Sequence, residues 1–162
     1  MPTNLLKVYN QLLELLYPSL PENIGSLYRV FNRDFCNVAI HCRGTRVEPT
    51  PAQGEDNMQR LFRHLTTVIT DEKTKKREFE SARSIRLHWI RYHLEGKAPE
   101  KLLGFKVQDE NRVYLLDKVE RYVVILEPLR NVSAYYLLTA YPLEPASFKK
   151  ILKKYETRSQ HL

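Results

Sequence analysis

The sequence has little cysteine and no long hydrophobic run, and each absence excludes a class of protein. Its two thiols, Cys36 and Cys42, have no second pair with which to build a zinc site or a disulfide framework. No stretch approaches the roughly 20 apolar residues that span a bilayer. The first residues carry Gln11 and Glu14 within their apolar run and lack a basic start, so a signal peptide is not expected. We therefore expect a cytoplasmic protein without a membrane partner.

Several catalytic motifs are absent as well. The chain has no glycine-rich phosphate loop, no G-x-S-x-G elbow and no H-E-x-x-H pair. Nucleotide hydrolases, α/β-hydrolases and zinc proteases are therefore disfavoured. His41 and Cys42 are adjacent, but no second ligand pair accompanies them. We expect neither a bound metal ion nor an organic cofactor.

Positive charge is present, and it is concentrated in two blocks. The 162 residues carry 26 lysines and arginines against 19 acidic residues, a formal net charge of +7. Residues 60–93 hold nine of these bases and four acids, and residues 145–162 hold five bases and one acid. Residues 1–40 are balanced. Such blocks favour nucleic acid as a partner, ahead of a membrane surface or an acidic protein, and a solvated helix face is the alternative.

Apolar periodicity predicts an α+β fold. Helices are expected over residues 3–16, 56–69, 80–95 (closed by Gly96) and 142–158. Strands are expected over residues 27–32, 35–41, 101–107, 112–117, 121–127 and 134–141. The last four strands have connections too short for helical crossovers, so they predict a four-stranded antiparallel sheet. The turn-rich stretch 43–57 is expected to be a linker, which divides an accessory region, 1–55, from a main domain, 56–162.

The helical segment 81–96 carries the first candidate site. On a helical wheel, Arg83 and Arg86 fall on one side with Trp89 at its edge, whereas His88 lies roughly opposite Arg86. Arg86 can clamp a phosphate through two N–H groups. The alternative is that the arginines pair with acids and that Trp89 belongs to the core.

The strand 134–141 and His64 carry the other two candidates. Strand alternation places Tyr135, Thr139 and Tyr141 on one face, where they can contact a phosphate or stack on a base. A half-buried sheet face explains the same residues equally simply. His64 is a candidate general acid or base, although a lone helical histidine is more often structural.

Cleavage of RNA without a metal ion requires three groups. A base takes the proton of the 2′-hydroxyl, a cation stabilises the phosphorane, and an acid or hydroxyl serves the leaving 5′-oxygen. His64, Arg86 and Thr139 can supply these groups.

An ordered set of motifs resembles a family with this activity. LFRHLTT, ARSIRLHWIRYHLEG, LLGFKVQDENRVYLL, YVVILEP, YYLLTAYPLE and KKILKKYE follow one another between residues 60 and 158. In this order they resemble the phage- and prophage-associated branch of the barnase–EndoU–colicin–RelE-like (BECR) ribonuclease superfamily. The resemblance implies N-terminal helices packed on a four-stranded antiparallel sheet with a C-terminal helix. It also implies a metal-independent endoribonuclease, often a toxin.

The resemblance is carried over residue by residue. His64 matches the histidine of the HL motif, Arg86 an arginine of the helical motif and Thr139 the threonine of the TAY motif, and we predict these three as catalytic. We predict as substrate-binding Arg83, His88, Trp89, Tyr135, Tyr141, Lys150 and Lys154.

RNA is the expected substrate, and an antitoxin or immunity protein is the expected partner. Residues 1–55 lie outside the resemblance and are the candidate surface for that partner or for an oligomer. Two other hypotheses stay open. A non-catalytic nucleic-acid-binding module would show salt-dependent binding without turnover. A phage-associated interaction protein would form a stable complex and would not bind RNA.

Overall fold

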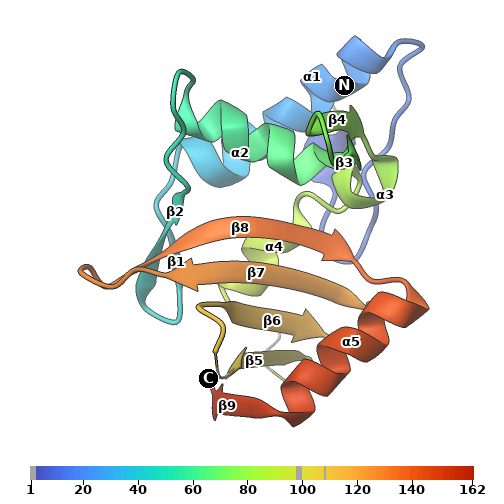
Figure 1. Cartoon of the computed structure of the whole chain (residues 1–162). Coiled ribbons are helices and arrows are strands. Elements are labelled where there is room, and N and C mark those ends of the chain that lie inside the picture. The colour runs from blue at the N-terminus through green and yellow to red at the C-terminus, as the bar shows by residue number, and fades with distance from the viewer. Residues whose placement is uncertain (1–2, 98–99, 108) are drawn as a thin grey trace.

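The computed structural model describes residues 3–97, 100–107 and 109–162, and among these residues the centre of the fold is a seven-stranded sheet (Figure 1). In spatial order its strands are β1 (Ile40–Cys42), β2 (Thr45–Pro49), β8 (Ala134–Pro142), β7 (Tyr122–Pro128), β6 (Val113–Asp117), β5 (Leu102–Val107) and β9 (Arg158–His161). β2 and β8 run parallel, and the other neighbouring pairs are antiparallel. The fold is α+β, but the predicted four-stranded antiparallel sheet is wrong, because the sheet is mixed, larger and curled.

β1, β2 and β9 lie outside the predicted four-stranded sheet. β2 lies in the expected linker and forms a hairpin with β1, which begins within the strand predicted over residues 35–41. The two turn residues of this hairpin, Arg43 and Gly44, have positive φ angles of 51° and 82°. Such two-residue turns match the twist of the strands that they join. β2 then pairs with β8, so residues on both sides of position 55 belong to one sheet. β9 follows the last helix and pairs with β5.

Helices cover both faces of the sheet (Figure 1). They are η1 (Thr3–Leu6), α1 (Leu20–Phe31), η2 (Asn32–Cys36), α2 (Asn57–Thr66), α3 (Ser81–Ser84), α4 (Trp89–Leu94) and α5 (Pro145–Glu156). α5 confirms the closing helix of the sequence prediction and packs on one face, whereas α1 to α4 pack on the other. A separate hairpin, β3 (Thr67–Asp71) and β4 (Lys76–Phe79), joins α2 to α3.

The central strand β6 shows how the core is divided. Val113 and Leu115 face the cluster beneath α1 to α4, and Tyr114 and Leu116 face the cluster beneath α5. Successive side chains of a strand point to opposite faces, so a strand covered on both sides is apolar throughout. This is why β6 is a continuous apolar run in the sequence.

The N-terminal segment does not form the helix predicted over residues 3–16. Of its described residues, Thr3–Leu6 form one 3-10 turn and the rest are irregular. The side chain of Asn4 donates to the main-chain oxygen of Glu14 at 2.9 Å and accepts from its amide at 2.7 Å. This side chain is buried and also donates to Ser26 at 3.0 Å. It therefore closes a loop that competes with helix formation.

The strands predicted over residues 27–32 and 35–41 are largely wrong, because α1 and the π-helical turn η2 occupy most of that stretch. Ser19 caps α1 by accepting from the amide of Glu22, and a proline occupies the first turn. Three apolar side chains of α1 are fully buried at helical spacing. The cap and this spacing outweigh the strand propensity of its aromatic and β-branched residues.

Two further predicted helices are shorter than expected. The helix over residues 56–69 ends at Thr66, where β3 begins. The hydroxyls of Thr66 and Thr67 donate to carbonyl oxygens of the preceding turn and so satisfy the end of α2. The helix over residues 80–95 is two short helices, α3 and α4, joined by a turn. Gly96 ends α4 with a φ of 65°, as predicted.

Candidate nucleic-acid interface

Arg83 is the residue around which α2, the β3–β4 hairpin and the second half of β8 meet. Its Nη1 donates to the main-chain oxygens of His64 and Thr67, each at 3.1 Å. The same atom lies 3.5 Å from Oγ1 of Thr139. Its guanidinium covers the ring of Tyr141, with Cζ 5.4 Å from the ring centroid. The structure thus brings Arg83, Thr139 and Tyr141 together, and it places the main chain of His64 beside them.

The imidazole of His64 lies among arginines. Burial lowers its pKa to about 4, with further lowering by the charges of Arg77, Arg60 and Arg63. The ring is therefore neutral at pH 7 and can accept a proton.

Arg77 of β4 belongs to the same cluster. Its Nε donates to Oγ1 of Thr67 at 2.8 Å, and its Nη2 donates to the main-chain oxygen of the same residue at 2.9 Å. Burial lowers the pKa of Arg77, and the charges of Arg83 and two further arginines lower it more. An arginine whose charged form is disfavoured by its neighbours indicates a surplus of positive potential, which attracts anions.

Acidic side chains neutralise part of this charge. Arg63 binds Glu55 through two hydrogen bonds of 2.7 Å. Nε of Arg83 lies 3.3 Å from a carboxylate oxygen of Glu80. Within the described ranges, no carboxylate oxygen lies within 4.0 Å of the other three arginines of this region, Arg60, Arg77 and Arg86.

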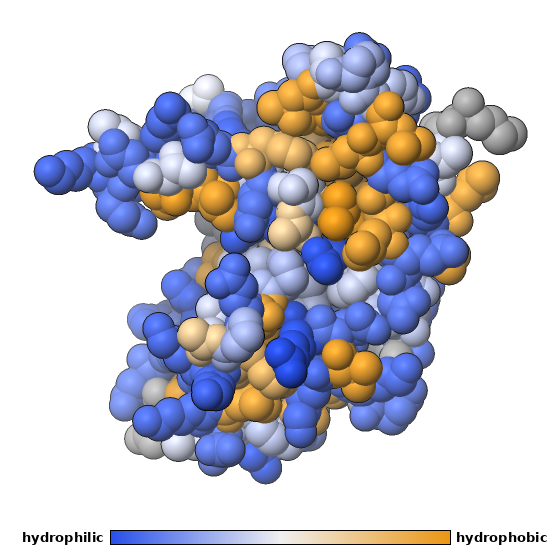
Figure 2. All heavy atoms as spheres, turned by 90° about the vertical axis from the view of Figure 1, so that its right-hand side faces the viewer, coloured by the Kyte–Doolittle hydropathy of each residue, from blue (hydrophilic) through white to orange (hydrophobic). Residues whose placement is uncertain are grey.

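The surface is hollowed beside the cluster. In Figure 2 a mostly hydrophilic arm projects at the upper left, and the surface beneath it recedes before the lower body of the molecule. By its place in Figure 1 the arm is the β3–β4 hairpin, and the lower body contains the sheet and α5. We call the surface around Arg60, His64, Arg77, Arg83 and Thr139 the basic recess. Clustered positive charge is typical of a surface that binds a nucleic-acid backbone.

Arg86 extends from the turn between α3 and α4 and lies over Trp89, with Cζ 5.3 Å from the ring centroid. Its Nη1 donates to the main-chain oxygen of Ala82. Trp89 is only 2% exposed, and its Nε1 donates to the main-chain oxygen of Gln11 at 3.0 Å. Trp89 therefore belongs to the core and supports Arg86 from below.

Two other predicted substrate contacts lie away from Arg83. His88 is buried, and its Nε2 is 3.3 Å from the main-chain oxygen of Val8 in the N-terminal segment. Tyr135 lies at the opposite end of β8 from Thr139, in register with Val47 of β2. The structure does not bring either residue into the basic recess.

The helix α5 carries the remaining predicted contacts. Lys154 is bound by Glu110 at 2.6 Å, whereas Lys150 is exposed. The predicted site residues did not include Arg60, Arg77 or Tyr122, whose buried hydroxyl is acted on by the charges of Arg83 and Arg86. Arg60 and Arg77 had a signal, because they belong to the first basic block, but Tyr122 showed nothing beyond a strand pattern.

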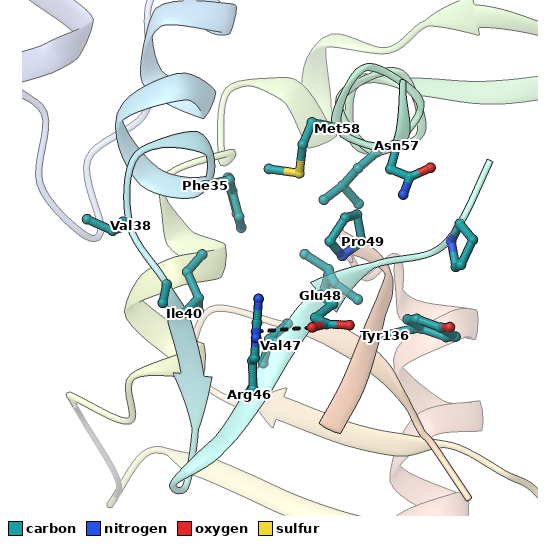
Figure 3. Close-up of a pocket in the computed structure, with 14 residues that line it drawn as sticks. Phe35, Val38, Ile40, Arg46, Val47, Glu48, Pro49, Asn57, Met58 and Tyr136 are labelled. Carbon is teal, nitrogen blue, oxygen red and sulfur yellow. Dashed lines mark ion pairs between the residues drawn. The ribbon is translucent and has the colours of Figure 1, made fainter. Parts of the chain in front are cut away.

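A pocket of about 340 Å³ lies at the other end of α2, between that helix and the β1–β2 hairpin (Figure 3). Phe35, Ile40 and Met58 are among its apolar lining residues. Arg46 and Glu48 form an ion pair of 3.0 Å at its side. This pocket can hold an apolar or aromatic group, and it shares α2 with the basic recess.

The described residues contain no group of three or more histidine, cysteine or acidic side chains that could hold a metal ion. No helix in the same part of the chain combines the length and apolar character needed to cross a bilayer. Comparison with models of protein families, with curated proteins and with solved structures found no match. Function is therefore inferred from the geometry of the basic recess.

Proposed function

We propose that the chain binds RNA in the basic recess and cleaves it without a metal ion. The observation that carries this proposal is the neutral imidazole of His64 beside Arg60, Arg63 and Arg77, with Arg83 bound to the main-chain oxygen of the same histidine. Arginines bind the phosphate backbone, and a neutral imidazole is the base that a 2′-hydroxyl requires. The sheet differs from the one that the ribonuclease resemblance implies, so the proposal rests on this cluster and not on the fold.

In the proposed reaction, His64 accepts the proton of a 2′-hydroxyl, and the 2′-oxygen forms a bond to the adjacent phosphorus. Arg83 and Arg86 stabilise the negative charge that develops on the phosphorane oxygens. The hydroxyl of Thr139, beside Arg83, contacts the phosphate or the leaving oxygen. The bond between phosphorus and the 5′-oxygen then breaks, and the imidazolium returns its proton to that oxygen. The products are a 2′,3′-cyclic phosphate and a 5′-hydroxyl.

The direct test is incubation of the purified chain with total RNA in excess EDTA. The expected result is RNA fragments that end in a cyclic phosphate. His64→Ala and the double variant Arg86→Ala/Thr139→Ala are expected to lose this activity. Lys97→Ala is the matched control, since it removes an exposed charge beyond α4. Absence of cleavage by the wild-type chain, or unchanged cleavage by the double variant, would contradict the proposal.

A non-catalytic RNA-binding role is favoured by one observation. Nη1 of Arg83 is engaged by the main-chain oxygens of His64 and Thr67, which suits a residue that holds the site together. A binding module would retain RNA in a filter-binding assay with strong salt dependence. It would yield no fragments in the EDTA assay, so the two assays together separate the roles.

We also propose residues 1–55 as the surface for a partner protein, such as an antitoxin or immunity protein, or for a second copy of the chain. This region exposes the large apolar side chains Leu6, Val8, Leu12, Leu16, Tyr17 and Leu20. A concentration of large exposed apolar side chains in one region is typical of interaction sites. A ribonuclease acting on the RNA of its own cytoplasm needs such a partner to restrain it. Light scattering of the purified chain tests for self-association, and co-expression with a neighbouring gene product tests for a restraining partner.

A further inference from the structure

Four buried side-chain polar atoms have no hydrogen-bond partner among the described residues, and one of them, Nδ1 of His88, lies against the N-terminal segment, away from the other three. The other three are Nε of Arg83, Nε of Arg86 and the hydroxyl of Tyr122. Tyr122 begins β7 and is only 1% exposed. We call these atoms the three-donor cluster.

The contacts of the three residues place them next to one another. Arg86 lies over Trp89, and the Trp89 ring meets the Tyr122 ring edge-on, with centroids 5.3 Å apart. The positive charges of Arg83 and Arg86 both act on the Tyr122 hydroxyl. They oppose the rise in its pKa that burial causes. The buried hydroxyl therefore lies within range of the charges of both arginines, and Trp89 packs between Arg86 and Tyr122.

The chemistry of the cluster shows which group would satisfy it. An arginine N–H can only donate, and a tyrosine hydroxyl can donate, so all three atoms lack an acceptor. The carboxylate of Glu80 lies 3.3 Å from Nε of Arg83, but the N–H does not point toward it. A buried donor left without an acceptor destabilises a fold, because the hydrogen bond that it lost to water is not replaced. Three such donors in one place are the signature of a site built for a ligand with several acceptor oxygens.

We infer that the three-donor cluster is a binding site for a tetrahedral oxyanion, namely a phosphate group. Phosphate oxygens carry the negative charge and the lone pairs that two guanidinium groups and a hydroxyl require. The inference rests in part on the proposed function, because Arg83 and Arg86 are common to both sites, but it adds Tyr122 as a residue that contacts the anion. The phosphate belongs either to an RNA backbone or to free inorganic phosphate, and the recognition chemistry is the same.

Tyr122→Phe is the sharpest test, because it removes one oxygen atom and keeps the buried ring. Inorganic phosphate is titrated into the wild-type chain and the variant, with chloride at equal ionic strength as the reference, and thermal unfolding and calorimetry are followed. We expect phosphate to stabilise the wild type and to bind Tyr122→Phe about tenfold more weakly. Without phosphate the variant is expected to be at least as stable as the wild type, because a buried hydroxyl without an acceptor has been removed.

Tyr92→Phe is the matched control, since it removes a tyrosine hydroxyl on α4, where the ring stacks on Tyr9. It is expected to leave phosphate binding unchanged. Phosphate that fails to stabilise the wild type overturns the inference. Equal protection of the wild type and Tyr122→Phe also overturns it, as does a large loss of stability of Tyr122→Phe without phosphate.

A second experiment identifies the source of the phosphate. RNA with 2′-O-methyl groups throughout cannot be cleaved, and its binding is measured with and without inorganic phosphate. Competition between the two, together with weaker RNA binding by Tyr122→Phe, identifies the backbone phosphate as the ligand. Phosphate binding that depends on Tyr122 without any RNA binding supports the anion site while it contradicts the proposed ribonuclease. RNA cleavage without Tyr122-dependent phosphate binding supports the ribonuclease and overturns the anion site.

Discussion

Asp117 of β6 lies 3.1 Å from Nε2 of His93 on α4, and both side chains are almost completely buried. Tyr9 donates to the same carboxylate oxygen, and Nδ1 of His93 faces the main-chain oxygen of Trp89 at 2.7 Å. Each ring nitrogen of His93 therefore lies against an oxygen of another residue. One carboxylate therefore ties the N-terminal segment and α4 to the sheet.

Asp117→Ala is expected to lower the free energy of unfolding by about 3 kcal/mol, because it leaves the buried His93 and the hydroxyl of Tyr9 without their shared hydrogen-bond partner. Urea denaturation followed by circular dichroism measures the change. Lys75→Ala is the control, since it breaks an exposed pair with Glu72 and is expected to cost less than about 1 kcal/mol. Equal losses in the two variants would show that the Asp117 network is not a structural tie.

The same carboxylate predicts a loss of stability in acid. Burial raises the pKa of Asp117, but hydrogen bonds from His93, the amide of Glu120 and Tyr9 outweigh it and hold the pKa at about 2, below the ordinary value of 3.8. The ionised carboxylate therefore stabilises the fold at pH values above the ordinary pKa of 3.8, and this contribution is lost as the pH falls through about 2. Wild-type unfolding free energy is expected to fall by about 2 kcal/mol over this window. Asp117→Asn, measured by urea denaturation at each pH, is expected to lack this part of the fall.

The pH profile of RNA cleavage tests His64 as the base. Burial and the neighbouring arginines lower its pKa to about 4, so the rate is expected to fall as the pH drops through that value and to be level above it. Arg77→Gln removes one of the charges that lower this pKa and is expected to move the inflection to higher pH. Single-turnover rates across the acid range measure it. An inflection that stays in place in Arg77→Gln would exclude His64 as the titrating group.

Salt dependence tests whether RNA lies in the basic recess. Each phosphate contact with a single strand contributes about 0.7 to the slope of log affinity against log salt concentration. The double variant Arg60→Gln/Arg77→Gln removes two contacts and is expected to reduce that slope by about 1.4. Lys97→Gln, which removes an exposed charge outside the recess, is expected to leave it unchanged. Fluorescence anisotropy with a non-cleavable RNA gives both slopes, and identical slopes in the three chains would place the RNA elsewhere.

Some elements were predictable because the information that specifies them is local. β5 to β8 follow from alternation and short connections, and α5 follows from its apolar spacing. The leucines of residues 3–16 show the same helical spacing, yet a hydrogen bond from Asn4 to the distant Ser26 helps to hold that segment in a loop. β2 could not be predicted as a central strand, because its partner β8 lies far along the chain and pairs with it in parallel.

The candidate site was likewise predictable only in part. The charge of Arg77, Arg83 and Arg86 is a property of the residues, and its concentration before the sheet is visible in the sequence alone. The contact between Arg83 and Thr139 joins positions 56 residues apart, so only the packing of α3 against β8 created it. The same packing buried the hydroxyl of Tyr122 beside two guanidinium groups. Periodicity along a chain predicts which face of a helix or strand a side chain occupies. The hydrogen-bonding groups around that side chain depend on which distant segments the tertiary fold brings together.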